Sequence, residues 1–427
     1  MAEQMKPSGI DWIGDIPKSW KVTRLQTLFD QVKDKNSGTK EKNLLSLSYG
    51  KIVKKDIEGA FGLIPESFDA YNIIKKNDIV LRLTDMQNDQ VSLRTGLVKE
   101  EKGIITSAYV TIRLKCGSPS YYHWYLYAFD TSKQIYAFGQ GVRQSLTFEE
   151  LKKMLILLPS PKEQQAIADF LDEECAQIDS IAADLEKQIA LLQQYKKSLI
   201  TETVTKGLDK SVPMKDTGVE WIGEIPEHWR LKRLKYIAKL KTGTTPPGNE
   251  GINYDENGIN WFTPSDFLPN MQLDTSEKYI DRETIRYENI QTYPRGSVLL
   301  VAIGATVGKI GISKNNAYSN QQITAVIPQH ISGNYLLYYL ASKSPYIKDN
   351  ALYTTLPIIN NSYLQNITIV VPPTTEQEKI VEFLNRKCSI IDELIEDKNK
   401  LLLRLQQHKK SLIYEYVTGK KRVKEVR

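Results

Sequence analysis

The chain has 427 residues, of which 41% are hydrophobic and 25% are charged, and its formal net charge is +6. This length favours two or three domains, and the composition is that of a soluble globular protein. No stretch approaches the roughly 18 apolar residues of a membrane span, and the N-terminus lacks the apolar core of a signal peptide, so we expect a cytoplasmic protein. The cysteines and histidines are few and scattered, which argues against a disulfide framework and against a metal site.

A first strand-rich domain is predicted over residues 1–158. It opens with the stretch DWIGDIPKSW, from Asp11 to Trp20. Short apolar runs between turn residues follow, among them DIVLRL, YVTIR and MLILLP, and this pattern is typical of β-strands. Polar loops separate these runs, including TDMQNDQVSLRT and GQGVRQSLT.

A long helix is predicted over residues 159–207. Apolar residues recur at steps of one, three or four positions from Ile167 to Leu199, so they share one helix face. No Pro or Gly interrupts residues 162–206, and Gly207 is a suitable stop. At 1.5 Å per residue, about 45 residues span roughly 68 Å.

The second half of the chain repeats the first. EWIGEIPEHW starts at Glu220, 209 positions after its counterpart, and opens a second strand-rich domain over residues 208–371. A second helix with a basic tail is predicted over residues 372–427, where LQQHKKSLI matches LQQYKKSLI 213 positions earlier. We interpret the tail KKRVKEVR as a solvated end.

These elements define an α+β fold with two strand-rich domains separated by two long helices. A helix of this length cannot bury its apolar stripe alone, so we expect the two helices to pair as an antiparallel coiled coil. The duplication then implies internal pseudo-two-fold symmetry. The alternative is two independent helices, each lying on its own domain.

The two domains share an apolar frame and differ in their polar loops. TDMQNDQVSLRT corresponds to IGATVGK, and GQGVRQSLT corresponds to YTTLPIINN. A duplicated scaffold with divergent loops suggests one task performed on two different targets. The tryptophan stretches are nearly identical in both halves, so we interpret them as packing segments that seat each domain against a helix end.

No motif in the sequence indicates catalysis. GATVGK, from Gly304 to Lys309, has three residues between its glycines where a phosphate loop has four, and Ile310 replaces the required Ser or Thr. A glycine-rich turn between strands is the better interpretation, with Lys309 available for a phosphate group. No serine, cysteine and histidine set for nucleophilic catalysis stands out.

The order of domains and helices resembles the specificity subunit of type I restriction–modification enzymes. The resemblance rests on WIGDIPKSW and WIGEIPEHW, on LPSPKEQQAIADFLD and PPTTEQEKIVEFLN, on the two KKSLI segments, and on GATVGKIG followed by NQQITAVIP. It implies two target-recognition domains, each reading one half of a bipartite site on double-stranded DNA, with the helices setting the spacing. It further implies two methyltransferase subunits docked on the helices, restriction (motor and nuclease) subunits joined through them, and no contact with a membrane. The chain would hold no cofactor, because S-adenosylmethionine belongs to the partner methyltransferase, and would be non-catalytic by itself.

Polar and basic side chains in the predicted loops are the candidates for DNA contact, because Arg, Lys, Asn, Gln, Ser and Thr read base edges or bind phosphates. In the first domain they are Lys51, Arg82, Gln87, Arg94, Arg143, Gln144 and Ser145. In the second domain they are Thr242, Thr244, Thr245, Thr306, Lys309, Asn320, Gln321, Gln322 and Thr354. Because the loops differ, we expect the two half-sites to differ.

Two other functions are compatible with the sequence. A helical scaffold that binds protein partners would show weak DNA affinity without sequence preference, whereas a specificity subunit keeps a sequence preference as salt weakens its binding. An enzyme with an unrecognised site would show activity in the isolated chain.

Overall fold

A computed structural model of the chain describes residues 4–55, 67–86, 93–137, 145–255, 258–288, 290–353 and 356–423. The chain divides into two compact units. The first unit comprises Met1–Leu185 and Lys400–Arg427, and the second comprises Glu186–Asn399. Each unit therefore holds one strand-rich domain together with part of both long helices. None of the helices in the described ranges is long and apolar enough to cross a membrane.

The first unit is built on a four-stranded antiparallel sheet. Its strand order is β4 (Phe29–Gln31), β11 (Val110–Leu114), β8 (Ile79–Leu81) and β9 (Thr95–Leu97). The central strand β8 is fully buried, which agrees with its uninterrupted apolar sequence. Helix α2 (Pro119–Thr131) follows the sheet, with Ser118 capping its N-terminus and Pro119 in its first turn.

Smaller elements complete the first unit. Antiparallel pairs join β1 (Met5–Pro7) to β2 (Asp15–Pro17), β3 (Lys21–Arg24) to β12 (Leu155–Leu158), β5 (Leu45–Ser48) to β6 (Lys51–Lys54), and β7 (Asn72–Lys75) to β10 (Lys102–Ile105). The short helices are α1 (Leu25–Leu28), η1 (Gln134–Ala137) and α3 (Phe148–Leu151).

The second unit repeats this plan. Its main sheet has the order β16 (Ala238–Thr242), β24 (Ile323–Pro328), β21 (Val298–Val301), β22 (Ile310–Ser313) and β19 (Gln272–Leu273). The first four strands correspond in order and direction to those of the first unit, and helix α6 (Gly333–Asp349) takes the place of α2. The expected match of the two apolar frames is confirmed, because β8 and β21 are the corresponding buried strands.

A second four-stranded sheet of this unit has the order β17 (Ile252–Asn253), β20 (Tyr279–Ile280), β18 (Ile259–Phe262) and β23 (Tyr318–Ser319). Paired strands are β13 (Met214–Asp216) with β14 (Glu224–Pro226), β15 (Arg230–Arg233) with β27 (Thr368–Val371), and β25 (Leu352–Tyr353) with β26 (Pro357–Ile358). The short helices are η2 (Leu234–Tyr236), η3 (Pro247–Asn249), η4 (Pro264–Asp266), α5 (Arg282–Tyr287) and α7 (Asn361–Asn366).

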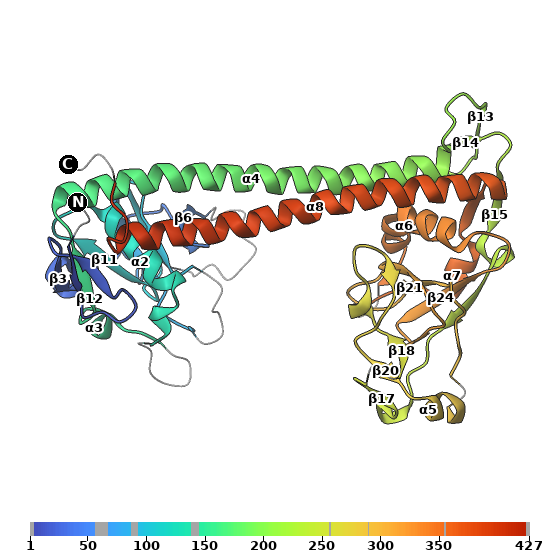
Figure 1. Cartoon of the computed structure of the whole chain (residues 1–427), viewed down its shortest axis with the longest axis horizontal. Helices are drawn as coiled ribbons and strands as arrows, with labels where there is room; N and C mark the ends of the chain where they lie inside the picture. The colour runs from blue at the N-terminus through green and yellow to red at the C-terminus, as the bar shows by residue number, and fades with distance from the viewer. Residues whose placement is uncertain are drawn as a thin grey trace. The chain divides into compact units, whose positions relative to one another are not determined.

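The long helices α4 (Pro161–Lys206) and α8 (Thr374–Val417) run antiparallel to each other within each unit (Figure 1). In the first unit Lys409 Nζ lies 2.6 Å from Asp179 Oδ1. In the second unit Lys196 Nζ lies 2.7 Å from Asp392 Oδ2. The antiparallel pairing is thus confirmed, and the alternative of two independent helices is wrong.

The tryptophan stretches lie against helix ends. Trp20 Nε1 donates to Glu163 in the first turn of α4 at 3.3 Å, and Trp229 Nε1 donates to Glu376 in the first turn of α8 at 2.9 Å. Both indoles are almost completely buried. Gly207, just past the end of α4, has φ +75°, and a Cβ atom there would lie 3.1 Å from the Trp229 ring. These residues therefore pack each domain against both helices.

The beginning of the basic tail is folded against the first unit. Arg422 forms an ion pair with Glu163 and lies over the Trp20 ring, 5.9 Å from its centre. Lys421 pairs with Glu415 at 2.8 Å. Lys421 is still 57% exposed, as expected of a solvated end, whereas Arg422 is partly buried against Glu163 and Trp20.

Candidate nucleic-acid interface

Three polar segments of the second unit come together at one end of its main sheet. They are residues 242–245, 302–309 and 319–322. The Thr244 N–H donates to the Ser319 carbonyl at 3.0 Å, and the Ala302 N–H donates to the Gln322 carbonyl at 2.8 Å. Most of the second-domain candidates therefore share one surface, although the sequence separates them by up to 80 positions.

Gly243 makes this close approach possible. A Cβ atom at Gly243 would lie 2.0 Å from the Asn320 carbonyl oxygen and 2.5 Å from the Ser319 carbonyl oxygen. Any larger residue would push the two segments apart. The packing of segment 242–245 against the turn at 319–322 thus depends on a missing side chain.

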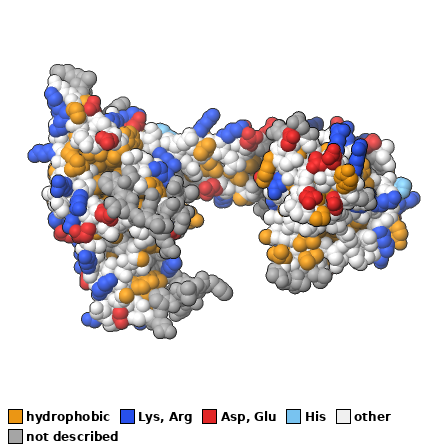
Figure 2. Space-filling view, turned by 90° about the horizontal axis from the view of Figure 1, so that it is seen from below, with side chains coloured by type: hydrophobic (Ala, Val, Ile, Leu, Met, Phe, Trp, Pro, Cys, Tyr) orange, Lys and Arg blue, Asp and Glu red, His pale blue; other side chains and the backbone are white. Residues whose placement is uncertain are grey.

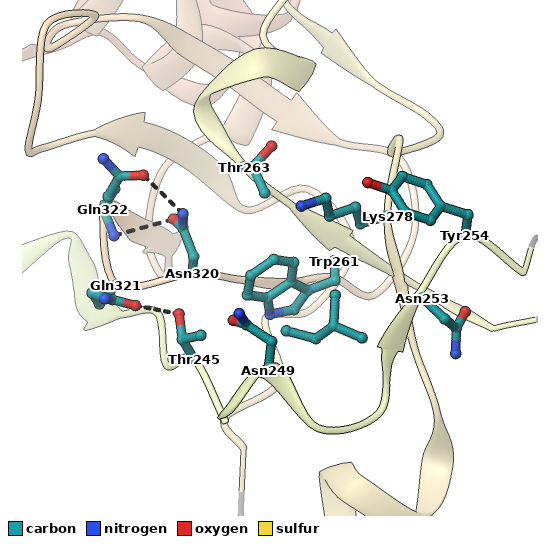
Figure 3. A pocket seen from close by; sticks show the side chains of 11 residues that line it. Thr245, Asn249, Asn253, Tyr254, Trp261, Thr263, Lys278, Asn320, Gln321 and Gln322 are labelled. Atoms are coloured by element: carbon teal, nitrogen blue, oxygen red, sulfur yellow. Dashed lines mark hydrogen bonds between the residues drawn. The ribbon is translucent and has the colours of Figure 1, made fainter. Parts of the chain in front are cut away.

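Three consecutive amide side chains in this turn differ in how they are held. Asn320 Nδ2 donates to Gln322 Oε1 at 2.9 Å, and Asn320 Oδ1 accepts from the Gln322 backbone N–H at 3.1 Å. Gln321 is exposed, and its Oε1 accepts a hydrogen bond from the Thr245 hydroxyl (Figure 3). The turn therefore presents Gln321 outward while its two neighbours lock each other.

A pocket of about 370 Å³ lies beside Gln321 (Figure 3). Trp261 from β18 is 4% exposed and forms part of its wall, and Lys278 Nζ lies 5.8 Å from the centre of the exposed Tyr254 ring. The other lining residues are Thr245, Asn249, Ile252, Asn253, Thr263, Asn320, Gln321 and Gln322. Aromatic, amide and basic side chains in one hollow suit a nucleic-acid surface, where bases and phosphates are contacted together.

Thr242, Thr306 and Lys309 of the second unit also lie near this surface. Thr242 accepts a hydrogen bond from Asn361 Nδ2 at 2.9 Å, and Asn361 Oδ1 accepts from Thr324 at 3.2 Å. Thr306 and Lys309 are both exposed on the turn between β21 and β22. The backbone N–H groups of residues 307–309 donate to carbonyls of the same turn or of β21, so they are not directed at a phosphate. This arrangement confirms a turn between strands rather than a phosphate loop.

The first unit places its candidates differently. Arg94 is fully buried, and its guanidinium donates to the carbonyls of Arg82, Thr84 and Asp85 at 2.9–3.2 Å. Its backbone N–H donates to Asp130 Oδ2 at 2.7 Å. A guanidinium used in this way holds the loop after β8 and cannot contact a base while the loop keeps this conformation.

Arg82, Ser145 and Lys51 remain candidates in the first unit. Arg82 is half-buried, Ser145 is exposed, and the Leu146 N–H donates to the Leu83 carbonyl at 2.8 Å, which brings the two loops together. Lys51 is exposed at the start of β6 and lies 4.0 Å from Asp179 of α4. Gln87, Arg143, Gln144 and Thr354 lie outside the described residues.

The corresponding turns of the two units carry different chemistry. The turn before β11 contains Thr106, Ser107, Ala108 and Tyr109, where the turn before β24 contains the three amides. The Tyr109 N–H donates to the Thr106 carbonyl at 3.2 Å, so both are tight turns at the same place in the fold. The same framework thus presents two different surfaces.

Residues that the loop patterns did not indicate also form this surface. Asn249, Asn253, Tyr254, Trp261, Lys278 and Asn361 were not predicted. Trp261 lies inside an apolar strand, and the others come from segments without a distinctive motif. The sequence around Tyr254 holds no Lys or Arg, and only tertiary packing brings Lys278 over the Tyr254 ring and both residues into the pocket beside Gln321.

On the face of the molecule that Figure 2 shows, Lys and Arg side chains are scattered among Asp and Glu side chains rather than gathered in one patch. In the part of the chain that the structure covers, no group of three or more His, Cys, Asp or Glu side chains could hold a metal ion. The assignment of this surface therefore rests on its loops.

Known proteins share this organisation. A family model described as Type I restriction modification DNA specificity domain matches residues 17–191 and 226–404, once in each half. The Type I restriction enzyme MjaIX specificity subunit of Methanocaldococcus jannaschii is 32% identical over 185 residues, which cover 42% of this chain and 41% of that protein. The MjaVIII specificity subunit of the same organism is 26% identical over 446 aligned positions, covering 96% of this chain and 95% of that protein.

One solved structure has the same fold. It comes from work on complex assembly and conformational transition of the type I R-M system, and it covers 95% of this chain and 99% of its own at a TM-score of 0.72 and 17% identity. The duplicated α+β plan and the divergent loop surfaces define a two-domain recognition protein. The chain belongs to the family of type I restriction modification DNA specificity domains.

Proposed function

We propose that the chain is the non-catalytic sequence-recognition subunit of a type I restriction–modification complex, in which each domain reads one half of an asymmetric bipartite DNA target. The observation that carries this proposal is the pairing of one framework with two different loop surfaces. Base edges in the major groove are read by side chains such as Gln, Asn and Arg, whereas phosphate contacts set the register. Two unlike surfaces would therefore select two unlike half-sites.

The helix pair would carry the partner subunits. In the second unit, Leu191 and Tyr195 of α4 and Ile390 and Leu394 of α8 are 45–56% exposed. Each of these pairs is spaced by four residues, so its members lie on one helix face. Large apolar side chains exposed on a regular surface are typical of protein–protein contacts. We assign these exposed apolar side chains to contacts with methyltransferase subunits, which would supply S-adenosylmethionine and methyl transfer, and through which restriction subunits would join.

A methylation map tests the proposal. The chain would be co-expressed with the methyltransferase subunit of its own system in a host without adenine methylation, and modified adenines would be mapped across the genome. We expect one bipartite motif with two unlike halves and a fixed spacer. A short continuous motif, or no motif, would contradict the proposal.

The helical scaffold remains the second candidate because the exposed apolar faces also suit protein partners without DNA. Titration of the assembled complex with target and non-target duplexes separates the two functions. A specificity subunit keeps a large affinity ratio between the duplexes as salt is raised, although both affinities fall. A scaffold shows no ratio at any salt concentration.

A further inference from the structure

The three amides at 320–322 do not have equal freedom to contact DNA. Asn320 and Gln322 are partly buried and bonded to each other through the side-chain and backbone contacts at 2.9 and 3.1 Å. These two bonds, together with partial burial, hold both side chains against the turn. Gln321 is the exposed member, and its side chain has one contact that fixes its orientation, the hydrogen bond from Thr245.

The backbone beneath Gln321 is fixed from both sides. The Asn320 N–H donates to the Phe262 carbonyl at 3.2 Å, and the Ile323 N–H donates to the Asn320 carbonyl at 3.2 Å. Segment 242–245 closes the other side through the Gly243 N–H, which donates to the Ile323 carbonyl at 2.9 Å. Thr245 and Gln321 therefore sit on two segments that cannot shift independently.

The hydrogen bond from Thr245 fixes the orientation of the Gln321 amide, and this determines which donor and acceptor groups the amide presents. A carbonyl oxygen has two acceptor sites, so among the described residues Gln321 Oε1 keeps one of them and both Nε2 hydrogens remain available. An oxygen acceptor beside a nitrogen donor matches the major-groove edge of adenine, where N6–H donates and N7 accepts. Guanine presents two acceptors, N7 and O6, at the same edge. A fixed Gln321 Oε1 would then face a second acceptor, and no hydrogen bond could form between them.

We infer that Gln321, positioned by Thr245, selects an adenine at one position of the half-site that the second unit reads. This inference rests on the proposed function and names the base and the positioning residue. Thr245 acts through Gln321 and not by its own contact with the base. The other half-site does not depend on either residue.

The test uses the complex of the full chain with its methyltransferase. Binding is measured on duplexes that carry each of the four base pairs in turn at every position of the mapped target. The unchanged chain should prefer A over the other bases at the Gln321 position by roughly 10- to 100-fold. Gln321→Ala should remove this preference at that position alone, and Gln321→Arg should shift it toward G, since Arg matches the two acceptors of guanine.

Two further variants test the positioning role. Thr245→Val keeps the shape but removes the donor, so it should weaken the preference for A at the same position. Thr245→Ser keeps the donor and should retain it. Gln329→Ala is the matched control, because Gln329 is also exposed and lies beyond the far end of β24, on the order of 20 Å from the turn.

The outcomes separate this inference from the function on which it rests. Unchanged base preferences in Gln321→Ala, with a bipartite target still recognised, would overturn the inference and leave the proposed function standing. A lost preference for a base other than A would also overturn it. An unchanged chain that directs no bipartite recognition would overturn both.

Discussion

Burial lowers the pKa of His123, a residue of α2. Its side chain is 9% exposed, and its Nδ1 finds no hydrogen-bond partner among the described residues. Burial, with repulsion from Lys99 and Lys409, lowers the pKa of His123 to about 4. In the unfolded chain the ordinary value is about 6.5. The folded state therefore holds this imidazole neutral where the unfolded state would protonate it.

This difference predicts a loss of stability on acidification. Above pH 6.5 the residue is neutral in both states, and as the pH falls from 6.5 to 4 only the unfolded chain gains a proton, at a cost of up to about 3 kcal/mol. His123→Phe should flatten the dependence of the unfolding free energy on pH in this window. Urea unfolding at several pH values measures it, with the exposed His408→Gln as the control. Equal slopes in His123→Phe and the unchanged chain would contradict the prediction.

Gly243 gives a second prediction at the residue scale. Gly243→Ala puts a methyl group 2.0 Å from the Asn320 carbonyl oxygen, so the backbone of one segment must move. We expect a destabilisation of about 1–3 kcal/mol, as for other overpacked sites, and a clear loss of affinity for the target duplex. Thermal melting and binding by the methyltransferase complex measure the two effects.

Gly296→Ala is the control for Gly243→Ala. Gly296 has φ +81°, so alanine is strained there by roughly 1 kcal/mol, but its Cβ would meet nothing within 4 Å. This variant should lose stability without losing affinity. If Gly243→Ala binds the target as well as Gly296→Ala does, the close approach does not position the turn.

At the scale of elements, the helix pair repeats one ion pair in each unit. Asp179 and Asp392 are 213 positions apart, as are Lys196 and Lys409, so the duplication produced the same contact twice. Both lysine side chains are 13–15% exposed, and both aspartates are about 40% exposed. A partly buried pair of this kind fixes the register of two helices more firmly than an exposed pair.

Charge reversal tests the register contact of the second unit. Lys196→Asp places two carboxylates together and should lower the unfolding free energy by about 1–3 kcal/mol, and adding Asp392→Lys should restore most of it. The exposed pair Lys76–Glu101 is the control, where reversal should change stability by less than about 0.5 kcal/mol. No recovery in the double variant would show that the pair does not set the register.

Over the whole molecule, the features that could be predicted from the sequence are those that are periodic or repeated. The helix stripes were predictable because an apolar period survives in the sequence, and the pairing was predictable because one helix cannot bury so long a stripe alone. The amide turn was predictable as a polar run between strands. The burial of Arg94 was not, since only the fold shows that its loop closes around the guanidinium. The position of Trp261 was not predictable either, because β18 brings it beside the turn at 320–322, almost 60 positions away in the sequence.

The repeated tryptophans give a prediction about the whole molecule. Residues that are alike in both halves hold the domains against the helices, whereas the recognised DNA sequence should depend on residues that differ between the halves. Trp229→Phe loses the hydrogen bond to Glu376 and leaves a small void, so the unfolding free energy should fall by about 2–3 kcal/mol. Trp20→Phe loses the corresponding bond to Glu163 and should behave alike.

Neither variant should alter the methylated motif, although both should lower the yield of assembled complex on warming. Melting of the purified chain measures the loss of stability, and methylation maps at a permissive temperature measure the recognised sequence. A changed base at any position in Trp229→Phe would mean that the repeated segment takes part in recognition. An unchanged motif together with a lower melting temperature would place specificity in the loops that the two halves do not share.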